Sequence, residues 1–321
     1  MRISVLALDG LFDTGLAVTL DALTAANGLA ARLMGGTPRF DVSTVGVRKR
    51  VRSGQGFTIP VQAITPDLKP DWVIVPALNT TTPDRLIPAL ERADVRRAVA
   101  QLLTWHREGV RIAASCIGTF LVAEAGLLDD REATTTWSLA PLFRQRYPHV
   151  SLDESRMLVP SDIGVTAGAA MGHLDLVLWL IRTASPGLAS LVSRYLLADI
   201  RSLQAPYIIP NHLAQADPLI QQFERWARDH LKEGFSLQEA AGALATSTRT
   251  LQRRCQEVLG KSPLAWFQDL RVERAQSLLH GSGLDIEAIA AEVGYEDGAT
   301  LRTLLRQRLG RGVRDLRAEL M

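Results

Sequence analysis

The last hundred or so residues carry one helical pattern twice, and this repeat strongly limits the folds open to them. Ser236 can cap a short helix with Glu239 three positions later, and Asp285 can cap its counterpart about fifty residues on. Helices are expected over 237–245, 248–259, 286–293 and 299–309. A short helix, a tight turn and a longer helix are typical of the helix-turn-helix motif, so the sequence predicts two such units.

The regions around the repeat complete a domain plan. An amphipathic helix is expected over 218–231, and a long helix over 263–279 would join the two units. Residues 204–212 contain two prolines and no helical period, which is typical of a linker. The prediction is an N-terminal domain over 1–195, a linker over 196–218 and an all-α domain over 219–321.

The charge of the chain is informative only locally. Thirty-six basic and 34 acidic residues leave a net charge of +2, which names no partner. Residues 247–274 carry six basic and three acidic side chains, 298–321 carry six and two, and 281–297 carry none and five. Positive charge therefore collects around the second helix of each unit, where contacts with DNA phosphates need it.

Residues 1–195 alternate short apolar runs with amphipathic stretches. Strands are expected over 3–8, 40–45, 72–75 and 111–114, and helices over 16–33 and 95–107. Such alternation predicts an α/β domain, a flavodoxin-like parallel sheet with helices on both faces. A hydrophobic content of 47% excludes a mostly disordered chain. In sheets of this kind, ligands bind beyond the carboxyl ends of the strands.

Cys116 follows one of these strands at a sharp turn. The strand continues into Ser115, Cys116 and Gly118, and a helix is expected over 120–128. Amides at the start of that helix would lower the pKa of the thiol and could bind an anion. Cys116 is thus either part of a functional pocket or a small buried residue.

These motifs resemble a known family. Residues 114–118 (ASCIG), 123–128 (AEAGLL) and 133–137 (ATTTW) resemble the class I glutamine-amidotransferase-like (PfpI-type) domain, in the version found in GlxA-type regulators. Residues 247–254 (STRTLQRR), 259–264 (LGKSPL), 270–275 (LRVERA) and 289–295 (IAAEVGY) resemble the AraC/XylS DNA-binding domain. The resemblance implies a sequence-specific transcriptional regulator whose non-catalytic first domain senses a small metabolite, dimerises, or does both.

The AraC resemblance also implies which residues touch DNA. Arg249, Gln252 and Arg253 would face one major groove. Thr300, Arg302 and Thr303 would face the next groove. Two departures from the family occur at Cys255 and Leu305, which replace usual aromatic residues.

An enzyme is the alternative, a cysteine-dependent amidase or peptidase-like protein with a DNA-binding tail. PfpI-type enzymes have a histidine after the cysteine, where this chain has Ile117, and GlxA-like chains commonly have one at the position of Thr136. His173 is the remaining candidate base, with Asp13 as an acid, although His173 could equally cap or pack a helix. A purely architectural DNA binder is a third possibility.

A small-molecule effector, if the first domain binds one, is expected over Cys116. The candidate ligand-binding residues are Cys116, Asp13, Asn79, Thr136, Trp137 and His173. Trp137 could cover an apolar or cationic group of the effector, or belong to the core.

The expected partners are double-stranded DNA, the effector, RNA polymerase if the protein activates transcription, and a second copy bound through the N-terminal domain. The two cysteines lack metal-ligand spacing, so neither a metal nor another cofactor is expected. The first residues lack the regions of a signal peptide, and no apolar run reaches the roughly 18 residues of a membrane span. The prediction is a cytoplasmic protein that does not enter the membrane.

Overall fold

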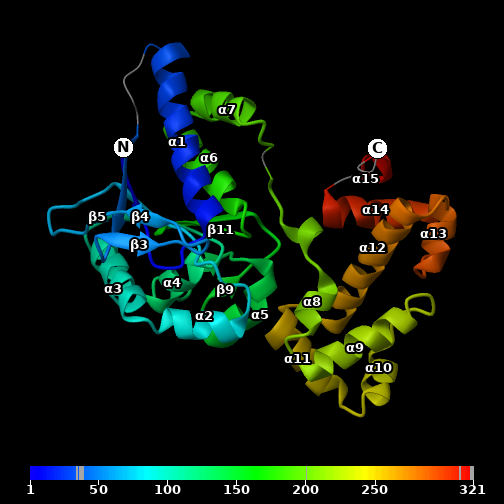
Figure 1. The fold of residues 1–321 in the computed structure, drawn as a ribbon. Coiled ribbons are helices and arrows are strands. Elements are labelled where there is room, and N and C mark those ends of the chain that lie inside the picture. The colour runs from blue at the N-terminus through cyan, green and yellow to red at the C-terminus, as the bar shows by residue number, and fades with distance from the viewer. Residues whose placement is uncertain (34, 36–39, 200, 311, 319–321) are drawn as a thin grey trace. The chain divides into compact units, whose positions relative to one another are not determined.

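The chain forms two compact units in a computed structural model that describes residues 1–33, 35, 40–199, 201–310 and 312–318 (Figure 1). Unit 1 comprises Met1–Gln204 and unit 2 comprises Ala205–Met321. None of the helices within the described ranges is both long and apolar enough to cross a bilayer.

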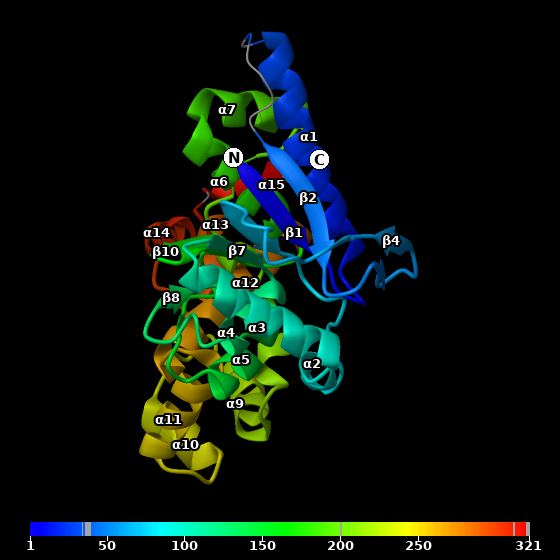
Figure 2. The same ribbon diagram turned by 90° about the vertical axis from the view of Figure 1, so that its left-hand side faces the viewer.

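Unit 1 is built on a seven-stranded, mainly parallel sheet. Its strands are β1 (Arg2–Leu6), β2 (Asp41–Gly46), β5 (Gln62–Ala63), β6 (Trp72–Val75), β7 (Arg111–Ser115), β10 (Leu158–Ser161) and β11 (Gly164–Ala167). They lie in the order β10-β11-β7-β6-β1-β2-β5, and only β10 pairs antiparallel. The five strands β2-β1-β6-β7-β11 follow the 2-1-3-4-5 order of flavodoxin-like sheets, so the predicted fold class is confirmed. Figure 2 shows β1 and β2 side by side.

Helices cover both faces of this sheet. One face packs against α1 (Asp13–Leu33), α6 (Gly172–Ala184) and α7 (Pro186–Tyr195), and the other against α2 (Pro83–Leu90), α3 (Ala93–Arg107), α4 (Gly118–Glu124) and α5 (Ala140–Arg146) (Figure 1). Small strands β3 (Arg50–Arg52), β4 (Thr58–Pro60), β8 (Glu132–Ala133) and β9 (Ser151–Leu152) lie outside the main sheet. Consecutive strand residues such as Val73 and Ile74 enter different cores, because both faces of a parallel sheet are covered.

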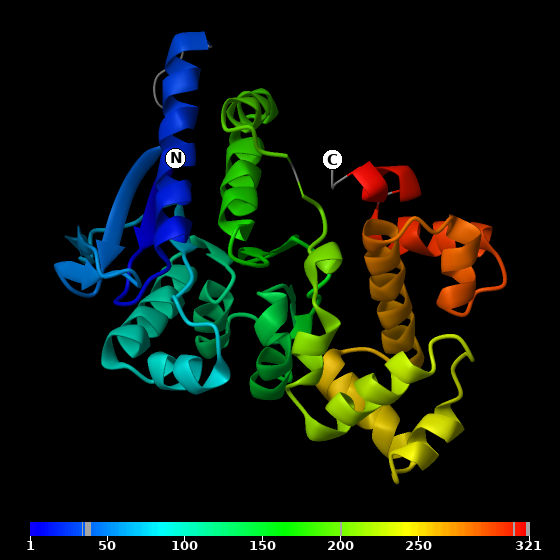
Figure 3. The ribbon, with the colours of Figure 1, turned by 45° about the vertical axis from the view of Figure 1, so that its right-hand side comes forward.

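Unit 2 is helical, as predicted. Its elements are the 3₁₀ turn η2 (Ala205–Tyr207), α8 (Pro210–Ala214), α9 (Pro218–Asp229), α10 (Leu237–Ala243), α11 (Thr248–Leu259), α12 (Pro263–Gly281), α13 (Ile286–Glu292), α14 (Gly298–Leu309) and α15 (Val313–Ala318). The two helix-turn-helix units are α10–α11 and α13–α14. Figure 3 shows the long helix α12, in orange, between them.

Described residues within the expected linker, 196–218, contact other parts of the chain. Gln204 is fully buried in unit 1, and α8 packs against α9 inside unit 2. Residue 200 lies outside the described residues. Contacts with residues distant in sequence order this segment, and its local composition gives no sign of them.

Local capping sets the limits of α11 and α14, the second helix of each helix-turn-helix motif. The Ser247 hydroxyl accepts from Thr250 N at 3.0 Å, and the Asp297 carboxylate accepts from Thr300 N at 2.7 Å. Gly260 and Gly310 end α11 and α14 with φ values of 67° and 69°, conformations that favour glycine. The capped helices bury Leu251, Cys255, Leu259, Leu301, Leu305 and Leu309. The two departures from the AraC pattern, Cys255 and Leu305, are therefore core residues.

A buried arginine joins two parts of unit 2. Arg271 of α12 donates through Nε and Nη2 to the carbonyl oxygen of Leu231, at 3.2 and 2.8 Å. Its guanidinium lies 4.8 Å from the ring centre of Phe267 and 4.9 Å from that of Tyr295. Gly294 has a φ of 79°, and a Cβ there would lie 2.2 Å from the Leu231 oxygen. The cation thus joins the segment before the first helix-turn-helix unit to the turn of the second.

Replacing Arg271 by Met should destabilise unit 2. The change removes a charged donor and leaves the Leu231 carbonyl without these hydrogen bonds, at a cost of about 2–4 kcal/mol. The measurement is urea unfolding followed by unit 2 tryptophan fluorescence, with Arg274→Met, an exposed position on the same helix, as control. Equal midpoints for the two variants would contradict the joining role.

Candidate functional site

The first candidate site is the exposed face of α11. Arg249, Gln252 and Arg253 are all exposed and, at positions three and four apart, share one side of the helix. Arg249 forms no ion pair with any described residue. Arg253 Nη1 pairs with Glu257 Oε1 at 2.9 Å, so its guanidinium is held along the helix. The face is cationic and can donate several hydrogen bonds.

The corresponding face of α14 is less rich in donors. Thr300, Arg302 and Thr303 are exposed, as expected for residues that touch DNA. The Thr300 hydroxyl donates to the capping carboxylate of Asp297 at 3.1 Å, and the Thr303 hydroxyl donates to Ala299 O at 3.0 Å. Arg302 lies 3.7 Å from Glu287. The two threonine hydroxyls therefore donate within the helix, and Arg302 supplies the charge.

Comparing the two faces reveals a residue that the sequence reasoning missed. The caps and buried leucines of α11 and α14 correspond at a constant offset in sequence, which aligns Arg306 with Gln256. Arg306 is exposed one turn after Arg302 and forms no ion pair with the described residues. Aligning every position of α14 with its counterpart in α11 would have identified Arg306 from the sequence.

The second candidate site is the turn at Cys116, between β7 and α4. Cys116 has a φ of 55°, in the left-handed region that non-glycine residues seldom adopt. Its N–H donates to Ala167 O at 2.8 Å, and its carbonyl accepts from the Thr135 hydroxyl at 2.7 Å. A Cβ at Gly118 would lie 2.1 Å from Val75 O, so only glycine fits there. The expected sharp elbow is present and held on several sides.

The thiol at this elbow is not activated. Burial raises the pKa of Cys116 to about 11, and the opposing hydrogen bonds from the Ile117 N–H and the Thr136 side chain are too weak to offset it. The side chain is only 7% exposed. The prediction of a lowered pKa is wrong, because loss of hydration outweighs the amides of the elbow.

His173 is held by the backbone. Its Nε2 accepts from Ala77 N at 3.1 Å, and its Nδ1 donates to Ala170 O at 2.6 Å. Burial lowers the pKa of the ring to about 4, so it is neutral at pH 7. Both ring nitrogens are used, and neither remains for a ligand or for the thiol. His173 packs and orders the start of α6.

The other candidate ligand residues divide into two groups. Thr136 contacts Cys116, and Trp137, which follows it in the 3₁₀ turn η1 (Trp137–Leu139), is half-buried. Asp13 and Asn79 instead contact the turn after β3: Asp13 Oδ2 accepts from Gln55 N at 3.0 Å, and the Asn79 side chain lies against Gly54. Asp13 also lines an open groove between α1 and the β3–β4 hairpin.

Known proteins resemble this chain in both of its units. Residues 240–319 match a family described as a helix-turn-helix domain. The HTH-type transcriptional regulator GbdR of Pseudomonas aeruginosa is 27% identical over 232 residues, which cover 71% of this chain and 63% of GbdR. The HTH-type transcriptional regulator GlxA of Rhizobium meliloti is 25% identical over 224 residues, covering 64% of this chain and 65% of GlxA. The chain is therefore similar to HTH-type transcriptional regulators along most of its length, and to a helix-turn-helix family in its last part.

A solved structure supports the fold of unit 1. A Vibrio parahaemolyticus protein of known crystal structure matches with a TM-score of 0.50 and 19% identity, over 61% of this chain and 98% of that one. The resemblance inferred from the motifs is confirmed. The alignments span less than two thirds of GbdR and of GlxA, so the activity of the whole protein is a proposal.

The raised pKa of the Cys116 thiol gives a pH-dependent test. A thiol with a pKa of about 11 is almost entirely protonated at pH 7, so its alkylation should speed up about tenfold for each pH unit between 7 and 10. The measurement is iodoacetamide labelling of the native protein by intact mass, with Cys116→Ser to subtract Cys255. Fast labelling that stays flat between pH 6 and 8 would instead indicate an activated nucleophile.

The ion pair on α11 gives a second test. Glu257→Gln removes a negative charge from the exposed face and frees Arg253, so the affinity for double-stranded DNA should rise about two- to fivefold at low salt. Fluorescence anisotropy measures the affinity for DNA. Glu233→Gln is the control, because it removes the same charge at an exposed position outside α11 and α14. An equal gain in both variants would mean that only net charge matters.

Proposed function

We propose that this GlxA-type chain is a sequence-specific, DNA-binding transcriptional regulator. The observation that carries the proposal is the pair of capped helices, α11 and α14, each with an exposed polar and cationic face and joined by α12. Helix-turn-helix proteins place such a second helix in the major groove, with residues near its N-terminus at the base edges. Two such helices would enter adjacent major grooves, about 34 Å apart.

The two faces would divide the work of recognition. Arginine and glutamine make paired hydrogen bonds to guanine and adenine edges, so Arg249, Gln252 and Arg253 are proposed to read bases. On α14, Arg302 and Arg306 suit phosphate oxygens, while Thr300 and Thr303 can still accept hydrogen bonds or contact a thymine methyl group. The first helix-turn-helix motif, α10–α11, would therefore supply more of the sequence discrimination than the second, α13–α14.

The first domain is proposed to bind rather than to catalyse. A cysteine enzyme needs a thiolate or a base within reach of the thiol. The Cys116 thiol has a raised pKa, and the His173 ring is bonded to backbone on both nitrogens. These two observations favour the regulator over the amidase or peptidase-like alternative.

Control by the first domain is part of the proposal. A small metabolite over the elbow would meet Cys116, Thr136 and Trp137, and the Thr136 side chain hydrogen-bonds to the thiol. A homodimer through the first domain, contact with RNA polymerase in an activator, and a cytoplasmic location stay predictions.

Arg253→Ala tests the reading of bases. If Arg253 makes a bidentate contact, its loss should cost about 1–3 kcal/mol of binding and relax the preference at one base pair. The measurement is anisotropy of the full chain on a duplex selected from a random pool and on its single-base variants. Arg225→Ala, an exposed arginine on α9, is the matched control. Equal losses on every duplex would assign Arg253 to a phosphate, and losses no larger than the control would remove it from the interface.

A further inference from the structure

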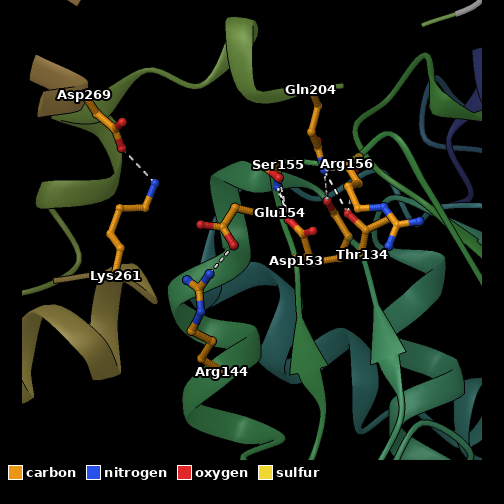
Figure 4. A network of polar contacts seen from close by, with 10 residues as sticks. Thr134, Arg144, Asp153, Glu154, Ser155, Arg156, Gln204, Lys261 and Asp269 are labelled. Atoms are coloured by element: carbon orange, nitrogen blue, oxygen red, sulfur yellow. Dashed lines mark hydrogen bonds and ion pairs between the residues drawn. The ribbon is translucent and has the colours of Figure 1, made fainter. Parts of the chain in front are cut away.

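Gln204, the last residue of unit 1, has its side chain fully buried among backbone and hydroxyl acceptors. Its Nε2 donates toward Thr134 Oγ1 at 3.0 Å, Thr135 O at 2.9 Å and Arg156 O at 3.1 Å. Figure 4 shows the side chain directed between Thr134 and Arg156. A glutamine at the point where the chain leaves the unit is thus anchored inside it.

The backbone around Gln204 is anchored as well. Gln204 N donates to Ser155 O at 2.8 Å, and Met157 N donates to Ser202 O at 3.0 Å. Arg156 and Leu203 form an antiparallel bridge between these two contacts. Residues 202–204 therefore add a short strand-like strap to residues 155–157.

A glycine makes room for the glutamine amide. A Cβ on Gly168 would lie 2.1 Å from Gln204 Nε2 and 2.6 Å from its Oε1, so any side chain there would displace the amide. Gly168 itself is held through its N–H, which donates to Met157 O at 2.9 Å. The recess for Gln204 is part of the fold.

The groups that hold Gln204 also hold the elbow. Thr135, whose carbonyl accepts from Gln204, donates through its hydroxyl to Cys116 O. The next residue, Thr136, contacts the thiol of Cys116. One short segment, 134–136, is therefore shared between the elbow and the strap, and a movement at Cys116 reaches Gln204 through a single residue.

Unit 2 begins at the next residue. Ala205 opens η2, and η2 lies against α14, the second helix of the second helix-turn-helix unit. Only one peptide bond separates the anchored glutamine from a turn that contacts a proposed DNA-reading helix.

We propose that Gln204 is a latch that couples occupancy of the Cys116 elbow to the DNA-binding unit through Thr135 and η2. This inference rests on the proposed function. When the 134–136 segment shifts, Gln204 loses its acceptors, the 202–204 strap loosens, and η2 is no longer held at its first residue. The latch is poised to open, because Gln204 Oε1 is buried with no hydrogen-bond partner among the described residues, which offsets part of what the donated bonds contribute.

Hydrogen exchange of the full chain tests the latch without any ligand. Gln204→Met keeps a side chain of similar length but removes the donor, so amides in 202–207 and Met157 N–H should exchange about tenfold faster, while the β1, β6 and β7 amides stay unchanged. Gln215→Met, an exposed glutamine of unit 2, is the matched control and should leave these rates as in the wild type. Unchanged exchange over 202–207 in Gln204→Met would overturn the latch.

A second variant tests the connection to the elbow. Thr135→Val has nearly the same shape but cannot donate to Cys116 O, so it should also speed exchange over 202–207. Cys116→Met, which adds bulk at the elbow, should also speed hydrogen exchange over 202–207 in the wild-type background. Combined with Gln204→Met, it should speed that exchange little further. Additive effects, or no effect of Thr135→Val on 202–207, would overturn the coupling.

DNA binding separates the failure of this inference from the failure of the proposed function. Gln204→Met should change the affinity for a duplex selected from a random pool by about threefold or more relative to Gln215→Met, with core exchange unchanged. Faster exchange without a change in affinity would overturn the regulatory role and leave the regulator proposal standing. Failure of the wild-type chain to select any duplex would overturn the regulator proposal, and with it the role of the latch.

Discussion

Unit 2 depends on one buried cation. The guanidinium of Arg271 lies between the rings of Phe267 and Tyr295 and donates to Leu231 O, so its charge is stabilised by π faces and a carbonyl dipole. A buried cation tolerates little movement of such neighbours, because water is not there to replace them. The segment that precedes the first helix-turn-helix motif is therefore held against the turn of the second. Under the proposed function, that constraint would help the two exposed faces to read DNA together.

The two repeats share their scaffold and differ in their faces. Equivalent caps, terminal glycines and buried positions give α11 and α14 the same length and the same exposed side. Both repeats bury the same positions, although the residue can differ there, as Cys255 and Leu305 do. Arg249 and Gln252 stand where the second repeat has Ala299 and Arg302, so the first repeat has more bidentate donors. The proposed division of base reading and phosphate contact rests on this difference.

The sequence predicted those features that depend on nearby residues. The limits of α11 and α14 agree with the structure within a residue, since Ser247, Asp297 and the terminal glycines act within one turn. The elbow at Cys116 was predicted for the same reason. The pKa of its thiol was not, because it depends on burial by residues distant in the chain. The backbone partners of His173 and the recess for Gln204 are likewise non-local, and an expected linker turned out to contain an anchored residue.

The strain at Cys116 has a structural explanation that does not require catalysis. A non-glycine residue in the left-handed region costs about 1–3 kcal/mol, and such strain persists only where the surroundings impose it. In an enzyme the elbow would present a thiolate, but here the thiol is protonated and the nearest candidate base is occupied. What the strained conformation does provide is a carbonyl placed for the Thr135 hydroxyl. Because the Thr135 carbonyl in turn accepts from Gln204, one residue bonds both to the strained elbow and to the last residue of unit 1.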